Sequence, residues 1–312
     1  MNPIRIGTRG SKLALFQAHH VADLLTRQGI SSEIVIIETK GDKVLDVAIS
    51  KIGSKGVFTE ELENQLAEGN VDIAVHSAKD LPSRLPEGFD VIAFTEREKV
   101  NDVIISHRKD FPDLNDNEKP ILLGTSSTRR IATLKHYYPH VKTTDIRGNL
   151  QTRIAKMENG ICDGLLLAYA GVHRMGYDQL IHKELNLQQF IPAVGQGSIG
   201  IEAHQLLPFE IKKAITNAVN HSSTSACLRA ERSFLKVLEG GCSIPAFALA
   251  QWKEGQLELK GGLMSLDGKN RLYDCFTGSE QQAESLGQQL ADSILTRGGD
   301  RMLQEIKKTL NE

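Results

Sequence analysis

The first two hundred residues alternate between short apolar runs and stretches with helical periodicity. Residues 4–6 begin a strand pattern, and the apolar residues of 13–24 then fall on one helical face. The run 33–38 is typical of a buried parallel strand, and 71–76 is a further strand pattern. Because strands that alternate with helices form sheets covered by helices, the pattern predicts an α/β fold with parallel sheets.

The same alternation continues from about residue 103 to 200, with strand-like runs at 121–123, 142–146 and 164–168. The C-terminal part follows another pattern, in which a helical face at 230–238 precedes three strand-like runs and two closing helices. Asp-Gly between two of these runs is a hairpin signal. This part therefore predicts a small α+β domain.

Composition narrows the class of protein. The 312 residues allow about two domains, possibly three, and 40% hydrophobic with 24% charged residues is ordinary for a soluble protein. A net charge of -2 argues against a general nucleic-acid binder, and neither a membrane span nor a signal peptide is recognisable. The four cysteines lack metal-ligand spacing. We expect a cytoplasmic protein without a metal or a nucleic-acid or membrane partner.

Two basic clusters follow consecutive strand patterns and open helices. The first is the segment 124–130, which ends in Arg129-Arg130, and the second is 145–153, which contains Arg147 and Arg153. A helix start offers free backbone N–H groups, and arginine adds a planar fork that grips carboxylate or phosphate. The clusters predict a focused anion site, although capped helices with solvated arginines would show the same residues.

Two further loops contain residues that could act on an anionic substrate. In the segment 76–82, Asp80 could act as a general acid or an electrostatic stabiliser, with Lys79 beside it. A polar turn with an ion pair is the simpler interpretation of these residues alone. The segment 51–58 could form a mobile loop over a ligand, or equally a solvated surface loop.

The segment 195–200 matches G-x-G-x-x-G, a pattern found in dinucleotide-binding proteins. It follows no clear strand, and a glycine-rich crossing between domains explains it better. Cys242 follows two glycines in a predicted loop. It could be a nucleophile, a covalent attachment point or an incidental free thiol.

Taken together, these segments resemble one family, porphobilinogen deaminase, also called hydroxymethylbilane synthase. The resemblance runs from Ile4 to about Ala250. Its motifs are Thr8-Arg9-x-Ser11-x-Leu13-Ala14-Leu15-x-Gln17, His76-Ser77-x-Lys79-Asp80-x-Pro82, Gly124-Thr125-Ser126-Ser127-x-Arg129-Arg130, Arg147-Gly148-Asn149-x-x-Thr152-Arg153, Pro192-x-x-Gly195-Gln196-Gly197, Ala230-Glu231-Arg232 and Gly240-Gly241-Cys242-x-x-Pro245.

The resemblance implies two α/β domains similar to periplasmic binding proteins and a small C-terminal α+β domain. Residues 1–99 with 200–217 would form the first domain, which holds the catalytic Asp loop. Residues 100–199 would form the second, with the arginine-rich turns, and 218–312 the third, which carries the cofactor. Such an enzyme would be a cytoplasmic monomer.

The implied activity is that of a transferase of tetrapyrrole and haem biosynthesis. A dipyrromethane cofactor, bound to Cys242 through a thioether, would serve as a primer. Four porphobilinogen units would be added to it with loss of ammonia, and hydrolysis would release hydroxymethylbilane. Asp80 would handle the protons and stabilise positive charge on the pyrrole nitrogens.

The resemblance also assigns the residues that would hold cofactor and growing chain, whose negative charge increases with every unit. They are Arg9, Ser11, Ser77, Lys79, Thr125, Ser126, Ser127, Arg129, Arg130, Arg147, Gly148, Arg153, Arg174 and Gln196, with Lys51, Lys55 and Phe58 on the loop over the site. We expect Arg129→Ala or Arg147→Ala to weaken chain binding more than stability. The main alternative is a non-catalytic carboxylate-binding protein of the periplasmic-binding type, because fold alone does not define function.

Overall fold

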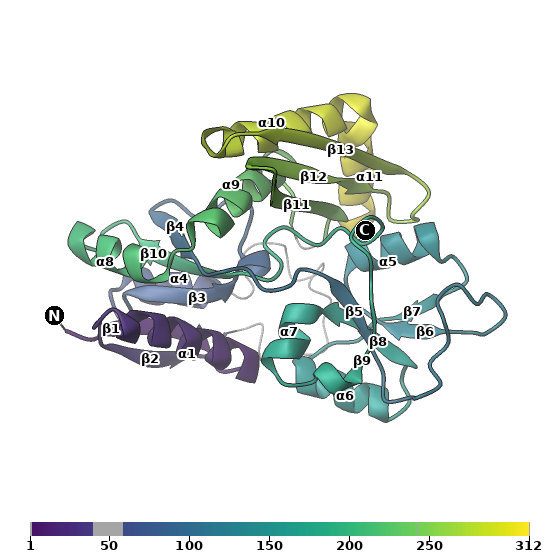
Figure 1. Cartoon of the computed structure of the whole chain (residues 1–312), viewed down its shortest axis with the longest axis horizontal. Coiled ribbons are helices and arrows are strands. Elements are labelled where there is room, and N and C mark those ends of the chain that lie inside the picture. Colours follow the sequence, from purple (N-terminus) through teal and green to yellow (C-terminus); the bar gives the residue numbers. More distant parts are fainter. Residues whose placement is uncertain (1, 40–58, 242, 312) are drawn as a thin grey trace.

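The computed structural model describes residues 2–39, 59–241 and 243–311. Its helices and strands form three groups, two of them built on five-stranded sheets and one on a three-stranded sheet (Figure 1). This arrangement confirms the predicted class of two α/β domains followed by a small α+β domain. The domain boundaries given above stay a prediction.

The first sheet has the order β2-β1-β3-β10-β4 and is covered by three helices. Its strands are β1 (Ile4–Arg9), β2 (Ser32–Ile37), β3 (Ile73–Ser77), β4 (Phe89–Phe94) and β10 (Ile199–His204), and its helices are α1 (Lys12–Arg27), α4 (Glu60–Ala67) and α8 (Phe209–Val219). One core lies beneath α1 and α8, and a smaller one, which includes Leu62 and Leu66, lies beneath α4.

Two expectations for this sheet were wrong. The segment 33–38 is a parallel strand but not a buried one, because β2 lies at the sheet edge and Ile36 is 58% exposed. The sheet is also mixed: β10, which follows the strands of the second sheet in sequence, runs antiparallel to β3 and β4. Sequence periodicity does not reveal this direction, because a strand that returns from another domain has the same apolar pattern.

The second sheet repeats the arrangement of the first, with the order β7-β6-β8-β5-β9. It contains β5 (Asp102–Ile105), β6 (Leu122–Gly124), β7 (Lys142–Thr144), β8 (Gly164–Ala168) and β9 (Ile181–Glu184), with helices α5 (Thr128–Tyr137), α6 (Leu150–Glu158) and α7 (Tyr169–Arg174). Here β5 is the antiparallel strand. The chain therefore crosses between the sheets twice, through residues 95–101 and 185–198.

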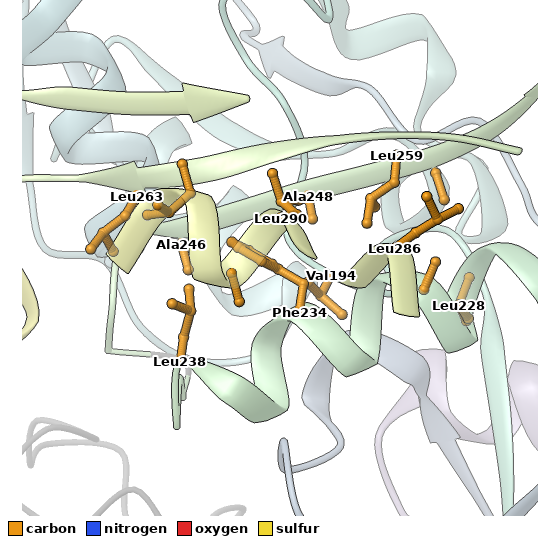
Figure 2. Close-up of a cluster of buried hydrophobic side chains, with 14 of the residues drawn as sticks. Val194, Leu228, Phe234, Leu238, Ala246, Ala248, Leu259, Leu263, Leu286 and Leu290 are labelled. Carbon is orange, nitrogen blue, oxygen red and sulfur yellow. The ribbon is translucent and has the colours of Figure 1, made fainter. Parts of the chain in front are cut away.

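The C-terminal domain packs helices against one antiparallel sheet of order β11-β12-β13. It comprises α9 (Ser222–Val237), β11 (Ala246–Lys253), β12 (Gln256–Met264), β13 (Arg271–Gly278), α10 (Ala283–Ile294) and α11 (Asp300–Asn311). Figure 2 shows its core, in which Phe234 of α9 lies among Leu286, Leu290 and the inner residues of the sheet. Val194, from the second crossing segment, contributes to the same core.

Candidate active site

The Asp80 turn follows the end of β3 directly. A single 3-10 turn, Ala78–Asp80, leaves Asp80 exposed and Lys79 half-buried. Ser77, the last residue of β3, is held by Gln17 of α1, whose side-chain nitrogen donates to the Ser77 hydroxyl at 2.8 Å. Gln17 itself is buried. The turn is therefore anchored from beneath, with its carboxylate free to face solvent or a ligand.

The electrostatic environment of Lys79 connects this turn to the second domain. Burial lowers the pKa of Lys79, and the nearby guanidinium groups of Arg130 and Arg129 lower it further, against the opposing effect of Asp80 and Asp102. The structure thus brings the Lys79–Asp80 turn close to the first basic cluster, although almost fifty residues separate them in sequence. The Lys79 ammonium group is partly removed from water, so a bound anion would stabilise its charged form.

The first basic cluster is organised around a buried carboxylate. Ser127 is the N-cap of α5, and Arg129 and Arg130 follow in its first turn. Asp102, fully buried at the start of β5, accepts a bond of 2.7 Å from Nη1 of Arg129 and another of 2.7 Å from Nη2 of Arg130. Burial alone would raise the pKa of Asp102, but the two guanidinium groups outweigh it and hold that pKa well below its ordinary value.

The second basic cluster binds an exposed carboxylate instead of a buried one. Arg147 Nε donates to Asp145 at 2.7 Å, whereas Arg153 Nε donates to the Gly148 carbonyl at 2.8 Å. Burial lowers the pKa of Arg153, as does neighbouring Arg130, while Asp80 and Asp145 raise it. Gly148 has a φ of 110°, a left-handed conformation that favours glycine. Arg153 therefore lies close enough to Asp80 for their charges to interact.

The two basic turns are joined to each other. Ser126 Oγ donates to the Ile146 carbonyl at 2.7 Å, and the buried Thr125 donates its N–H to the Thr144 carbonyl at 3.0 Å. Because β6 and β7 are parallel neighbours, both turns emerge at the same edge of the sheet. This edge faces the first domain, as expected for a site at the carboxyl ends of strands.

Helix α7 closes the site from the second domain. Arg174 Nη2 donates to the Gly197 carbonyl at 2.7 Å, and burial lowers the pKa of Arg174. A small cavity of about 30 Å³ lies between α7, α1 and the end of β3, and Ser77, Lys79 and Arg174 line it. The cavity therefore joins predicted site residues from both α/β domains.

The other predicted residues divide into three groups. Arg9 ends β1, and the Ser11 hydroxyl caps α1 by accepting from the Ala14 N–H at 3.2 Å. Gln196 is buried in the crossing segment, where its side-chain nitrogen donates to Asp102 at 3.0 Å. The predicted loop residues Lys51, Lys55 and Phe58 and the predicted attachment residue Cys242 lie outside the described residues.

Sequence reasoning missed the acids and the amide that organise the site. Asp102 stands at the head of an otherwise apolar strand, which is a signal that a buried cation must accompany it. Glu231 and Gln17 occur in the motifs quoted above, but neither was assigned a role. Gln17 and Asp102 bind residues that are distant in sequence within their own domains, and Glu231 binds residues of the crossing segments, so no local pattern identifies the contacts.

The glycine-rich segment 195–200 leads into strand β10 rather than into a helix. It therefore lacks the helix N-terminus on which a dinucleotide pyrophosphate would bind, and the dinucleotide hypothesis is not supported. Within residues 2–39, 59–241 and 243–311, no group of three or more His, Cys, Asp or Glu residues is arranged to hold a metal ion. No helix of the described chain is long and apolar enough to span a membrane.

Fold and site together define a protein of two α/β domains, with cationic side chains of the second domain close to the Asp80 turn of the first, and an appended α+β domain. The family described as "Porphobilinogen deaminase, dipyromethane cofactor binding domain" matches residues 4–206, and "Porphobilinogen deaminase, C-terminal domain" matches residues 225–296. The chain belongs to the porphobilinogen deaminase family.

Relatives with this name are similar over nearly their whole length. Porphobilinogen deaminase of Desulfosudis oleivorans is 55% identical over 98% of this chain and 98% of its own. The protein of the same name from Cytophaga hutchinsonii is 54% identical, over 99% of this chain and 98% of its own. These relatives support the enzyme family and not the alternative of a non-catalytic carboxylate-binding protein.

Proposed function

We propose that this chain is a transferase that joins four porphobilinogen molecules head to tail, with loss of ammonia, and releases the product hydroxymethylbilane by hydrolysis. The observation that carries the proposal is a group of half-buried cations around the Asp80 turn. Lys79, Arg153 and Arg174 make no ion pair with a carboxylate in the described part of the chain. Burial lowers the pKa of all three, so each would gain from a bound anion.

Dipyrromethane fits this set of donors, because its acetate and propionate groups are carboxylates and guanidinium groups bind carboxylates through paired hydrogen bonds. The residues that would hold it and the growing chain are Arg9, Ser11, Ser77, Lys79, Thr125, Ser126, Ser127, Arg129, Arg130, Arg147, Gly148, Arg153, Arg174 and Gln196. When bound, the cofactor supplies the free pyrrole carbon from which the chain is extended. We place its attachment at Cys242 and assign loop roles to Lys51, Lys55 and Phe58.

Asp80 is the residue we assign to proton transfer. Its side chain is exposed on a turn that is fixed by the Ser77–Gln17 bond, and it lies near the positive charges of Lys79 and Arg153. A carboxylate in this position can take a proton from a pyrrole nitrogen or carbon and can stabilise positive charge that develops there. The cations around it would neutralise the substrate's carboxylates, whose number grows with each addition.

We further infer a cytoplasmic monomer. The cytoplasmic location is supported by the free thiols of Cys162, Cys227 and Cys275, which a reducing compartment maintains. Sedimentation of the purified protein would test the monomer, and a stable dimer would contradict it.

Intact mass of the purified protein tests the proposal most directly. We expect an adduct of two linked pyrroles that is absent from Cys242→Ser protein. Asp80→Asn should keep the adduct and the fold while turnover falls by roughly 10²- to 10⁴-fold, the usual range for a general acid or base. The matched control is Asp90→Asn, which removes an exposed carboxylate of β4 that pairs with Lys212 of α8. An unmodified mass in an active preparation would contradict the cofactor assignment, and normal turnover of Asp80→Asn would exclude its role.

A further inference from the structure

The turn Gly195–Gly197 in the second crossing segment is where the three domains meet. Gly195 packs on the backbone of the Asp80 turn so closely that an added Cβ would lie 2.9 Å from the Ala78 carbonyl carbon and 3.0 Å from the Lys79 nitrogen. Gly197 packs in the same way on the Glu98 carbonyl of the first crossing segment. Both glycines have left-handed φ values, 76° and 94°. Any movement of this turn must therefore be transmitted to Lys79 and Asp80.

Glu231, a fully buried residue of α9 in the C-terminal domain, holds the turn in place. Its carboxylate accepts the Gly195 N–H at 2.9 Å and the Ala250 N–H of β11 at 2.8 Å. Arg97 of the first crossing segment grips the same carboxylate with two bonds, of 2.5 and 3.1 Å. All of its bonds thus go to groups that are buried or nearly so, where charge-assisted bonds are strong.

Arg97 extends the contact toward the arginine cluster. Its Nε donates to the Gln196 carbonyl at 2.9 Å, and the Gln196 side chain donates to Asp102 at 3.0 Å. Asp102 in turn binds Arg129 and Arg130. A continuous series of hydrogen bonds therefore runs from the C-terminal domain to the second α/β domain.

Apolar packing also joins the Asp80 turn and the second crossing segment to the C-terminal domain. Ala78 of the Asp80 turn and Val194, next to Gly195, are both buried in the core of the C-terminal domain with Phe234. Figure 2 shows Val194 pointing into this core beside Phe234. The Asp80 turn is thus supported by the C-terminal domain through both charge and packing.

We propose that Glu231 is a positioning residue for the reaction: through Arg97 and the Gly195–Gly197 turn it fixes the Lys79–Asp80 turn against the arginine cluster. This inference rests on the proposed function. It gives the C-terminal domain a part in the chemistry of the cleft, in addition to the cofactor attachment proposed for it. Glu231 acts through other residues and touches no reacting atom.

A single neutralising substitution would leave one buried charge without its partner and could prevent folding. The test therefore uses Arg97→Gln/Glu231→Gln, which removes both charges and leaves polar groups of similar shape. The matched control is Arg229→Gln/Glu284→Gln, which removes an exposed ion pair of 3.1 Å that also joins α9 to another element. If the first variant does not fold, Arg97→Lys keeps the charge but loses the two-bond grip and the Nε bond to Gln196.

Two measurements decide the proposal. Hydrogen exchange at the amides of 76–81 should become at least about tenfold faster in Arg97→Gln/Glu231→Gln and stay unchanged in the control. The adduct should be retained, and kcat for porphobilinogen consumption should fall at least about tenfold with KM changed less than about threefold. Unchanged exchange at 76–81, or normal kcat despite faster exchange, would overturn the proposal. The exchange result does not depend on turnover, so it remains informative if the wild-type protein lacks the adduct, the outcome that contradicts the proposed function.

Discussion

The two basic turns of the second α/β domain begin in the same way and serve different purposes. Each follows a strand of one sheet, opens a helix with a polar N-cap and carries two arginines. In the first turn, both arginines bind the internal carboxylate of Asp102. In the second, Arg153 donates to a backbone carbonyl and its charge faces the Asp80 turn. A count of arginines in a motif therefore overstates the positive charge that a ligand can use.

The difference follows from burial. Arg129 and Arg130, in the first turn of α5, have only 4% and 7% of their surface exposed, so a charge without a partner would be costly there. Arg153 is only half-buried, so water or a ligand can reach it. The first turn is thus held by its internal ion pairs with Asp102, whereas the second leaves the charge of Arg153 accessible to a ligand.

The largest effect should come from removing the internal carboxylate. Asp102→Asn leaves two buried guanidinium groups without an anion and should lower the free energy of unfolding by about 3–5 kcal/mol. Asp145→Asn, at the second turn, removes a carboxylate that is 58% exposed and should cost under about 1 kcal/mol. Urea unfolding of both variants measures the difference. Equal losses would show that the two turns are not distinguished by burial.

The same experiment has a defined pH dependence. Because the pKa of Asp102 is lowered in the folded state, its stabilising effect is complete above the ordinary aspartate value of about 3.9 and is lost as the pH falls through the folded value. The stability gap between wild type and Asp102→Asn should therefore be constant from neutral pH to about pH 4 and narrow below it. A gap that closes at pH 6 would contradict this assignment.

The next comparison substitutes one arginine in each turn. Arg130→Met should lower the free energy of unfolding by about 2–3 kcal/mol, because it removes buried charge-assisted bonds to Asp102. Arg153→Met should cost under about 1 kcal/mol of stability but reduce porphobilinogen consumption about tenfold, through loss of a charge that a bound carboxylate would use. Arg129 resembles Arg130 in its contacts, so for Arg129→Ala we now expect a loss of stability rather than a mainly functional effect. The prediction fails if Arg153→Met is the less stable protein.

Sequence reasoning predicted the elements of this region but not the division of roles. The runs at 121–123 and 164–168 and both helix starts follow from local periodicity and capping residues, and the structure has strands and helices there. The assignment of Arg129 and Arg130 to Asp102 does not follow from any local pattern. Their partner begins a different strand, 27 residues away from Arg129, and only the folded sheet brings them together. The same holds for Glu231, whose partners come from both crossing segments and β11.

Lys79 provides a smaller effect that depends on pH. Its folded-state pKa is lowered by burial, so the unfolded chain binds more protons between that pKa and about 10.5. Stability should therefore rise with pH in this window, by at most about 1.4 kcal/mol per pH unit. Urea unfolding from pH 8 to 10.5, in a Cys242→Ser background that cannot carry the proposed adduct, compares Lys79 with Lys79→Met. The lysine protein should gain stability relative to the methionine protein, and a relative loss would show that Lys79 is stabilised as a cation by Asp80.

The smallest effect concerns the helix caps. Asn149 Oδ1 accepts both the N–H and the hydroxyl of Thr152 at 2.9 Å, whereas Ser127 Oγ accepts the Arg130 N–H only at 3.5 Å, the outer limit of a hydrogen bond. Asn149→Ala should therefore lower the free energy of unfolding by about 1 kcal/mol, and Ser127→Ala by about half of that or less. The effect on turnover should have the opposite order. The Ser127 hydroxyl makes a weak cap and is half-buried at the edge that faces the Asp80 turn, where it can donate to a carboxylate, while Asn149 uses its oxygen within the helix. If Asn149→Ala reduces turnover more than Ser127→Ala does, the second turn and not the first supplies the hydroxyl and amide contacts to the growing pyrrole chain.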